Sequence, residues 1–273
     1  MRLKLAIQKF IFEIIMIFFS ICMLAPFWMV LVNSFKPKAD ANRLSAALPA
    51  VWNFENYAIV FKEGKLLRAF FNGVIVSFFS VALIILFSSM AGFVISRKNS
   101  RLTNKAYFLF ISGLIVPSAM IPTYWILSNL KLVNTYPGLI SIYVTYGLPF
   151  SIFMYVGFIK TIPREIDEAA YIDGASQLKM FYSVVFPLLK PTTVTVLIFN
   201  IMNVWNDVQI QMYFADAKKW SMPMSVYGFF GKYSTNWNLV FADIVLTILP
   251  VVIVYAFLQK HIISGMTAGS VKG

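Results

Sequence analysis

Few residues in the sequence have the types and spacing that covalent chemistry requires. Residues 228–233 hold the glycines and the lysine of a phosphate-binding loop, but the first glycine has the wrong spacing and Tyr233 stands where serine or threonine would reach magnesium. The single histidine, His261, ends the last apolar run, and the single cysteine, Cys22, lies inside the first. Together they allow neither an intrachain disulfide nor a zinc ligand set. We therefore expect this chain to have no catalytic residue, no metal and no ATP site of its own.

A group of polar residues interrupts the apolar stretch 192–213. Asn200, Asn203 and Asp207 recur at i, i+3 and i+7, which places them on one face of a helix, with Trp205 and Asn206 alongside. Polar groups within a membrane helix usually face the interior of a bundle or a water-filled path. Two interpretations stay open: these residues line a transport pathway or gate, or they form hydrogen bonds that hold neighbouring helices together.

The charged residues are densest in the segment 160–191. Six of them fall within sixteen positions, so this segment cannot lie in hydrocarbon: Arg164, Glu165, Asp167, Glu168, Asp173 and Lys179. Pro163, the acids of the first turns and Gly174 predict a short helix over residues 163–173. A second short helix is predicted from Ser176, as its N-cap, to Pro187. We call this predicted helix–Gly–helix segment, residues 160–191, the elbow.

The elbow has the features of a docking surface. Ala169 and Ala170 are small enough to let another protein approach closely, while Glu165, Glu168 and Ile172 share one helical face. The alternative is a solvated, charged loop between two membrane helices.

The composition identifies the chain as an all-α membrane protein. Of its 273 residues, 59% are hydrophobic and 12% are charged, far from the values typical of soluble domains. The net charge of +12 does not indicate nucleic acid, because the basic residues lie in loops and helix ends, where anionic lipid headgroups account for them.

The apolar runs predict six transmembrane helices, each about twenty residues or longer. Their ranges are 10–32, 69–96, 106–127, 138–159, 192–213 and 239–258. We expect a break in the fourth near Gly147 and Pro149, and a lone acid, Asp243, at the membrane interface. Residues 97–105 carry four basic side chains and residues 129–137 only one, so the former should face the cytoplasm. This orientation makes 33–68 an external loop and places the elbow, both termini and the tail 261–273 in the cytoplasm.

The elbow also matches a family pattern. Glu168-Ala169-Ala170, three residues, Gly174, nine residues and then 184–187 (Val-Val-Phe-Pro) resembles the EAA loop of ABC-importer permeases. The family pattern ends in Ile-x-Leu-Pro, and the two departures here keep the apolar character. By this resemblance the residues that couple to an ATPase are Glu165, Glu168, Ala169, Ala170, Asp173, Gly174 and Pro187.

Other stretches resemble the carbohydrate-uptake, maltose-type branch of the same family. They include residues 33–37, 52–57, 71–73 and Trp205-Asn206-Asp207, although the aromatics of 52–57 could equally form an interfacial belt. The tail 265–273 resembles the C-terminal tail that reaches into the ATPase dimer in maltose-type permeases, while a disordered tail is its alternative. The tail residues that this resemblance assigns to the ATPase contact are Gly265, Thr267, Gly269 and Lys272.

The resemblance implies a permease subunit of an ATP-driven sugar importer, most simply for an oligosaccharide, in a prokaryotic cytoplasmic membrane. It implies a second homologous permease as a heterodimer partner, two copies of a sugar-importer ATPase that bind ATP and magnesium, and an extracellular solute-binding protein. One alternative is the same architecture serving a non-sugar solute. The other is an ion-coupled secondary carrier, for which Asp207 would be the only mid-membrane candidate.

Overall fold

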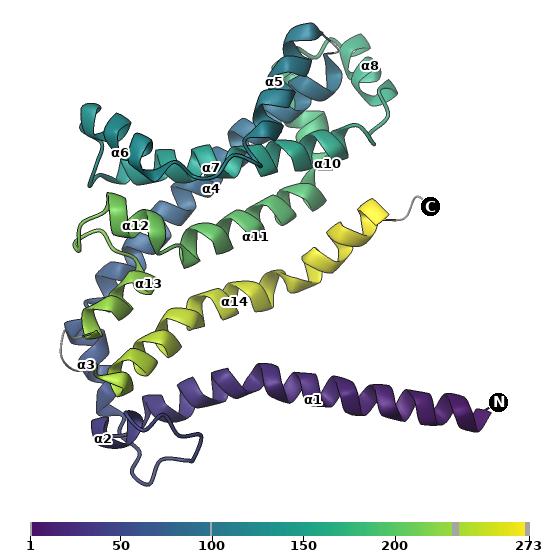
Figure 1. Cartoon of the computed structure of the whole chain (residues 1–273). Helices are drawn as coiled ribbons and strands as arrows, with labels where there is room; N and C mark the ends of the chain where they lie inside the picture. Colours follow the sequence, from purple (N-terminus) through teal and green to yellow (C-terminus); the bar gives the residue numbers. More distant parts are fainter. Residues whose placement is uncertain (1, 99, 231–234, 271–273) are drawn as a thin grey trace. The chain divides into compact units, whose positions relative to one another are not determined.

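The structure, a computed structural model, describes residues 2–98, 100–230 and 235–270, and within these ranges the side chains from 9 to 257. The described residues form helices joined by loops, with a single antiparallel bridge between Phe230 and Thr235 (Figure 1). This confirms the predicted all-α class. The chain divides into two compact units, Met1–Leu67 with Met224–Pro250, and Arg68–Pro223 with Val251–Gly273.

The first unit contains three helices before Leu67 and a second group after Pro223. These elements are α1 (Arg2–Ser34), α2 (Lys38–Ala41), α3 (Glu55–Glu63), the end of α13 (Met222–Ser225), the 3-10 helix η2 (Val226–Phe229) and the start of α14 (Trp237–Ser270). The buried Asn56 side chain joins them, because its amide nitrogen donates to the Ser34 and Lys36 carbonyls at 2.8 and 2.9 Å and its oxygen accepts from Asn238 at 2.7 Å. The stretch 33–68 is therefore an ordered loop that contains two short helices.

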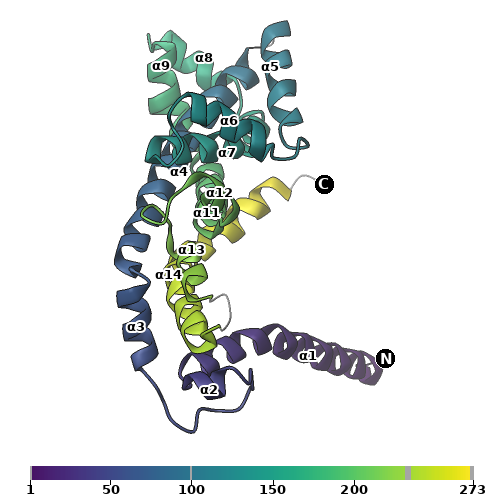
Figure 2. The same ribbon diagram turned by 60° about the vertical axis from the view of Figure 1, so that its left-hand side comes forward.

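The second unit contains the long helix α4 and the elements that follow it. In order they are α4 (Leu66–Arg97), α5 (Arg101–Ser112), α6 (Met120–Asn129), α7 (Tyr136–Ile159), α8 (Glu165–Ile172), α9 (Gln177–Met180), the π-helix η1 (Phe181–Val185), α10 (Phe186–Leu188), α11 (Lys190–Asn206) and α12 (Gln209–Phe214). Helix α7 packs against α5, α11 and α12, and the elbow lies beside the C-terminal end of α4 (Figure 2).

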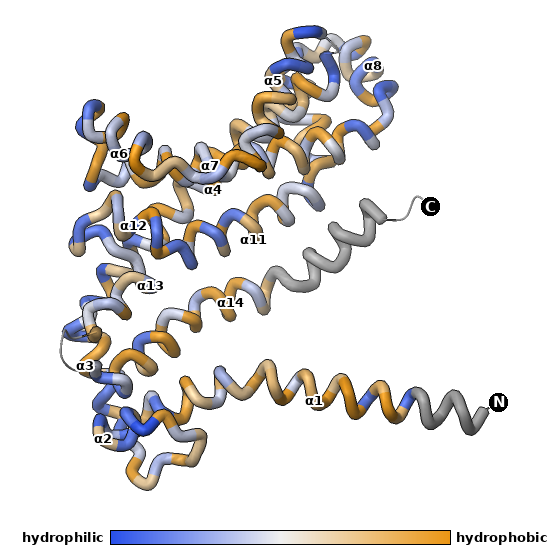
Figure 3. Tube along the Cα trace, viewed as in Figure 1, coloured by the Kyte–Doolittle hydropathy of each residue, from blue (hydrophilic) through white to orange (hydrophobic). Residues whose placement is uncertain are grey.

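Four described helices are long and apolar enough to cross a membrane. They are Lys9–Ser34, Leu66–Arg97, Tyr136–Ile159 and Trp237–Phe257, with mean hydropathies of 2.5, 2.5, 1.6 and 2.5. The segments Gln177–Leu188 and Lys190–Asn206 meet at an angle of 78° and make a fifth span if they are counted together. Hydrophilic residues cluster around α8, while apolar residues follow the long helices (Figure 3).

The prolines act differently in two of the predicted spans. In the stretch 106–127 the helix stops at Ser112 and restarts at Met120, on either side of Pro117. The predicted break near Pro149 is wrong, because α7 is one helix from Tyr136 to Ile159. Gly147 serves packing instead: a Cβ there would lie 2.4 Å from Ile84 and 2.6 Å from the Asn200 side-chain oxygen.

Two predicted helix ends also need correction. The stretch 192–213 is not one helix, because α11 ends at Asn206, Asp207 is extended and α12 begins at Gln209. The Asp207 carboxylate accepts a hydrogen bond from the Ile210 backbone N–H at 2.9 Å, so it serves the start of the next helix rather than continuing the first. The second elbow helix continues past Pro187 to Leu188, since proline fits an early position of α10.

Candidate functional site

The first elbow helix, α8, begins and ends close to the predicted residues. Its first turn holds Glu165, Asp167 and Glu168, whose charge favours a helix N-terminus. At its other end Gly174 has φ +78°, its N–H donates to the Tyr171 carbonyl, and the Ala175 N–H donates to the Ala170 carbonyl, both at 3.0 Å. These two bonds form a Schellman motif, which requires the left-handed residue that glycine provides.

The second part of the elbow starts at the predicted cap. The Ser176 hydroxyl accepts from the Lys179 backbone N–H at 3.3 Å, which confirms Ser176 as the N-cap. The chain then passes from α9 through the π-helical turn η1 to Leu188, and the buried Leu189 marks the bend into α11.

The elbow has an inner, buried face and an outer, exposed one. Ile162, Met180 and Val185 are buried in a core shared with α4 and α7. Tyr171 and Ile172 are 73% and 84% exposed, a large apolar area for a segment that also carries many charges. The outer face is thus suited to a protein partner.

Most of the predicted coupling residues lie on this outer face. Exposed ones are Glu165, Glu168, Ala169, Asp173, Gly174 and Pro187. Ala170 is the exception: it is 8% exposed and belongs to the core with Met180 and Val185. The prediction that Ala170 contacts a partner is therefore corrected, because its small side chain lets α8 pack onto the protein's own core.

A cavity of about 690 Å³ opens between α4, α8 and α9. Its apolar lining includes Phe93, Tyr171 and Met180, and charged residues line it as well. One of these, Arg97, forms an ion pair with Asp167 in which Nε lies 2.5 Å from the carboxylate, and its Nη1 donates to the Ile162 carbonyl at 3.1 Å. The sequence alone suggested no role for this pair, which joins residues seventy positions apart.

Three of the predicted pathway residues line one cavity of about 430 Å³, together with Tyr143 and Phe150: Asn200, Asn203 and Asp207. Asn200 is 2% exposed and donates to the Ser151 hydroxyl of α7 at 3.0 Å. Asp207 accepts from the Tyr143 hydroxyl at 2.9 Å. These two residues therefore link helices and line the cavity at the same time.

Asn203 differs from the other two cavity residues in its contacts, and Trp205 and Asn206 do not line the cavity. Asn203 is exposed and donates only to the Phe199 carbonyl of its own helix, so its oxygen is directed to no described partner. Asn206 is exposed away from the cavity lining, while Trp205 is 6% exposed and packs near Phe70 with ring centroids 6.0 Å apart. The structure thus separates the Trp-Asn-Asp triplet into a packing, an exposed and a cavity residue.

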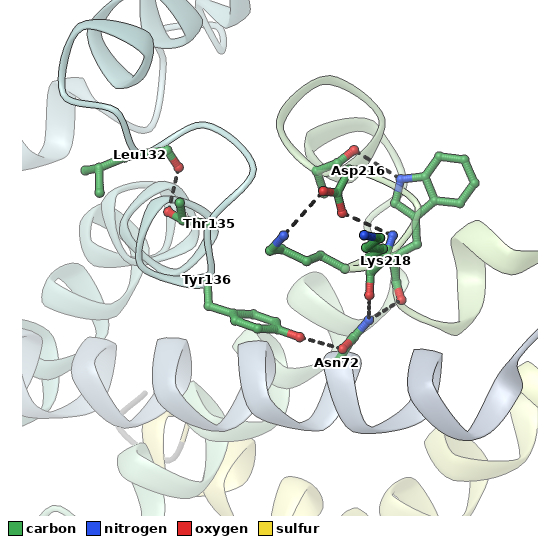
Figure 4. Close-up of polar contacts among 9 residues, drawn as sticks. Asn72, Leu132, Thr135, Tyr136, Asp216 and Lys218 are labelled. Carbon is green, nitrogen blue, oxygen red and sulfur yellow. Dashed lines mark hydrogen bonds and ion pairs between the residues drawn. The ribbon is translucent and has the colours of Figure 1, made fainter.

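A polar hub near the start of α4 was not assigned any role from the sequence. Asn72 is 4% exposed, accepts from the Tyr136 hydroxyl at 2.7 Å, and donates to the carbonyls of Lys218 and Trp220 at 2.9 and 3.0 Å (Figure 4). The turn that Asn72 holds is closed further by Asp216, whose carboxylate lies 3.4 Å from Lys219 Nζ. In the sequence Asn72 stood out only as part of residues 71–73, one of the stretches that resemble carbohydrate-uptake permeases.

Helix α14 contains the predicted interfacial acid, Asp243, and most of the predicted tail residues. Asp243, predicted at the membrane interface, is fully buried and accepts from the Ser225 hydroxyl at 2.9 and 3.1 Å. Its position at the membrane interface stays a prediction, and its burial comes from the packing of this stretch of α14 against α13. The tail residues Gly265, Thr267 and Gly269 fall where side chains are outside the described part, and Lys272 lies outside the described residues.

Comparison with known proteins agrees with the family suggested by the sequence. Residues 84–268 match the family described as "Binding-protein-dependent transport system inner membrane component". The chain is 37% identical to the melibiose/raffinose/stachyose import permease protein MelC of Bacillus subtilis, with 91% of each chain covered. It is 33% identical to the probable starch degradation products transport system permease protein AmyC of Thermoanaerobacterium thermosulfurigenes, covering 98% of this chain and 99% of the relative.

A solved structure has the same fold. The bacterial ABC transporter involved in the import of the acidic polysaccharide alginate contains a chain that superposes with a TM-score of 0.81 at 22% identity, covering 93% of this chain and 96% of that one. The elbow pattern, the membrane helices and the sequence relatives thus point the same way. The chain belongs to the family of inner-membrane components of binding-protein-dependent transport systems.

Proposed function

We propose that this chain is one permease subunit of an ATP-driven importer of sugars, and of oligosaccharides in particular. The observation that carries the proposal is its identity of 33–37%, over more than nine tenths of its length, with permeases named for melibiose, raffinose and stachyose, for starch degradation products and for multiple sugars. Permeases of this family have no nucleotide site, so a separate ATPase hydrolyses the ATP.

The elbow is the proposed contact with that ATPase. Its outer face combines the exposed apolar Tyr171 and Ile172 with the acids Glu165, Glu168 and Asp173. An exposed apolar pair surrounded by charged residues suits a protein contact, because the apolar side chains are buried on binding and the charges select the partner. In this proposal ATP closes two ATPase copies, the elbow follows as a rigid body, and the permease alternates between inward-open and outward-open forms.

Six spans with both termini in the cytoplasm fit this role. The four long helices, the bent pair around Leu189 and the interrupted stretch α5–α6 supply them. Exposed apolar residues within the interruption and just after it, Ile115 at 83% and Ile121 at 84%, suit contact with lipid. The four basic side chains of residues 97–105 support a cytoplasmic position for the elbow.

The cavity that contains Asn203 and Asp207 is the proposed part of the translocation pathway. A sugar passes most readily along a lining that offers both hydrogen-bonding and aromatic groups, and this cavity has both, with Tyr143, Tyr146 and Phe150. A second homologous permease would complete the pathway, and an extracellular solute-binding protein would deliver the sugar. The tail 265–273 is proposed to contact the ATPase.

Glu168→Lys tests the proposed contact. Glu168 is exposed and forms no ion pair among the described residues, so the change should leave the permease folded and inserted. Against a basic patch on the ATPase it replaces attraction with repulsion, which costs about 1–3 kcal/mol if the contact excludes water. We expect co-purification with the ATPase and sugar uptake to fall about tenfold or more.

Glu55→Lys is the matched control for this experiment. It makes the same charge reversal at an exposed first-turn acid of α3, in the loop proposed to face outward. Normal uptake by Glu168→Lys, or an equal loss by Glu55→Lys, would remove the elbow as the ATPase contact.

A further inference from the structure

The Arg97 side chain fixes the elbow to the end of α4. Its guanidinium contacts both Asp167 carboxylate oxygens, at 2.5 and 3.4 Å, and donates to the Ile162 carbonyl at 3.1 Å. The two charged side chains are only 13% and 15% exposed, and two different guanidinium nitrogens donate, one to the Asp167 carboxylate and one to the Ile162 carbonyl, which fixes the orientation of the side chain. The first turn of α8 and the segment that leads into it are therefore held to the last residue of α4.

Helix α4 differs from the other three candidate spans in its proline content. The other three contain a proline, Pro26, Pro149 or Pro250, whereas α4 has none in its 32 residues. Proline removes a helical hydrogen bond and favours bending at that point. An α-helix without proline bends less readily than one with proline, so a displacement of one end is passed on more fully to the other end.

Near its C-terminal end α4 closely contacts α7. A Cβ on Gly92 would lie 2.7 Å from the Tyr155 Cβ, so the two helices approach each other without an intervening side chain. Near the same end the Ser96 hydroxyl donates to the Val156 carbonyl at 3.4 Å. A displacement of α4 at the elbow therefore moves α7 as well.

The opposite end of α4 is fixed in a similar way. The Asn72 amide forms hydrogen bonds with Tyr136, the first residue of α7, and with the backbone at Lys218 and Trp220 (Figure 4). Asn72 and Arg97 are twenty-five residues apart, roughly 37 Å along a helix axis. Each end of the helix thus holds a segment distant in sequence, the elbow at one end and the turn 215–220 at the other.

We propose that α4 is the lever that carries the elbow's movement to the turn 215–220, with Arg97 and Asn72 as its two positioning residues. The proposal rests on the function proposed above, in which an ATPase moves the elbow. Without the Arg97 contacts the elbow would keep only its apolar packing against α4 and α7, and less of its movement would reach the far end of the helix for each ATP hydrolysed.

The test uses the complete transporter, with both permeases, the ATPase and the binding protein, in proteoliposomes. Uptake and ATP hydrolysis are measured together for Arg97→Gln, Asp167→Asn, the double variant and Arg97→Lys. A second readout is the maleimide reactivity of Ala217→Cys, at the exposed tip of the turn, in a Cys22→Ser background, with and without ATP.

We expect each neutral single variant to lower sugar uptake per ATP hydrolysed by about tenfold, as expected for residues that act as one unit. The double variant should be no worse than the worse single, and Arg97→Lys, which keeps the charge but not the fork, should be intermediate. ATP should change the reactivity of the cysteine at 217 in the parent protein, and this response should disappear in Arg97→Gln and in Asn72→Ala.

Arg101→Gln is the matched control, since it removes the same charge four residues later from an exposed side chain. The double variant keeps the test valid if one single variant folds poorly, because it leaves neither charge half-buried and unpaired. Parent-level uptake per ATP in Arg97→Gln and in the double variant, or a double loss equal to the product of the single losses, would overturn the lever alone. Absence of ATP-driven uptake in the parent would overturn the proposed function, and the lever with it.

Discussion

Substitutions at Gly174 can show whether glycine is needed there for its positive φ or for the space that it leaves to a docked partner. Gly174 has φ +78°, and no atom of the described chain lies within 4 Å of the position that a Cβ would occupy. The Cβ of a new side chain would therefore meet no neighbour among the described residues. The expected penalty comes from the left-handed conformation alone, about 1–2 kcal/mol for an ordinary residue.

The free-energy penalty of each substitution at Gly174 should depend on how well the new residue tolerates positive φ. Gly174→Asn should be nearly harmless, since asparagine often adopts this conformation, whereas Gly174→Ala should cost about 1 kcal/mol, a factor of about five in the population of the native turn. Gly174→Val should be the worst, because a branched Cβ is strongly disfavoured there. A residue that avoids positive φ would weaken the Schellman hydrogen bonds that the Gly174 and Ala175 N–H groups donate.

The assay is ATPase stimulation and uptake by the reconstituted transporter, with thermal unfolding of the permease as a check on folding. The backbone argument predicts the order Gly, Asn, Ala, Val for both coupling and the stability of the elbow. If the ATPase surface instead requires empty space at this position, asparagine will be as harmful as valine and alanine will be mild. That order, or no effect from any of the three, would refute the backbone argument.

Three further predictions concern the last helix, the tail and the pathway. Asp243→Asn should keep the free energy of unfolding, whereas Asp243→Leu should lower it by about 1–3 kcal/mol because it removes the bonds from the Ser225 hydroxyl; equal thermal stability of both variants would contradict this. Deletion of residues 267–273 should reduce ATPase stimulation but not membrane insertion, and wild-type uptake after the deletion would exclude a role for the tail. Asn203→Cys in a Cys22→Ser background should react with water-soluble thiol reagents in at least one transport state, and protection in every state would exclude position 203 from the pathway lining.

The parts of the elbow that could be predicted are those with local causes. Gly174 ends α8 and Ser176 caps α9 because each makes hydrogen bonds to residues at most five positions away. Capping preferences act over the same short range, so the sequence contains them directly. The fold class and the main apolar helices follow from composition and length in the same way.

The features that were missed or wrong depend on distant residues. The Arg97–Asp167 pair joins positions seventy apart, and Asn72 bonds to residues almost 150 positions away, so no local pattern indicates either. Ala170 was assigned to the partner contact from its small size and from the resemblance to the EAA loop, although the same size allows core packing.

The predicted helix was also continued through Asp207, one residue past the observed end of α11 at Asn206. Asp207 was placed on a helical face with Asn200, but it ends α11 and bonds to the backbone of α12. The cavity still brings the two side chains to one lining, because the change of direction is followed at once by another helix. The prediction that Asn200 and Asp207 lie together is therefore confirmed, but the single helical face assumed for them is wrong.

The most direct test of the central claim is ATP-driven sugar uptake by proteoliposomes that contain this chain with its partner permease and ATPase, supplied with binding protein loaded with an oligosaccharide. We predict uptake that requires ATP, the ATPase and the binding protein together, and no ATP hydrolysis by this chain alone. Uptake by this chain alone, driven by a proton or sodium gradient and unaffected by Glu168→Lys, would contradict the claim that it is the coupling permease of an ATP-driven importer.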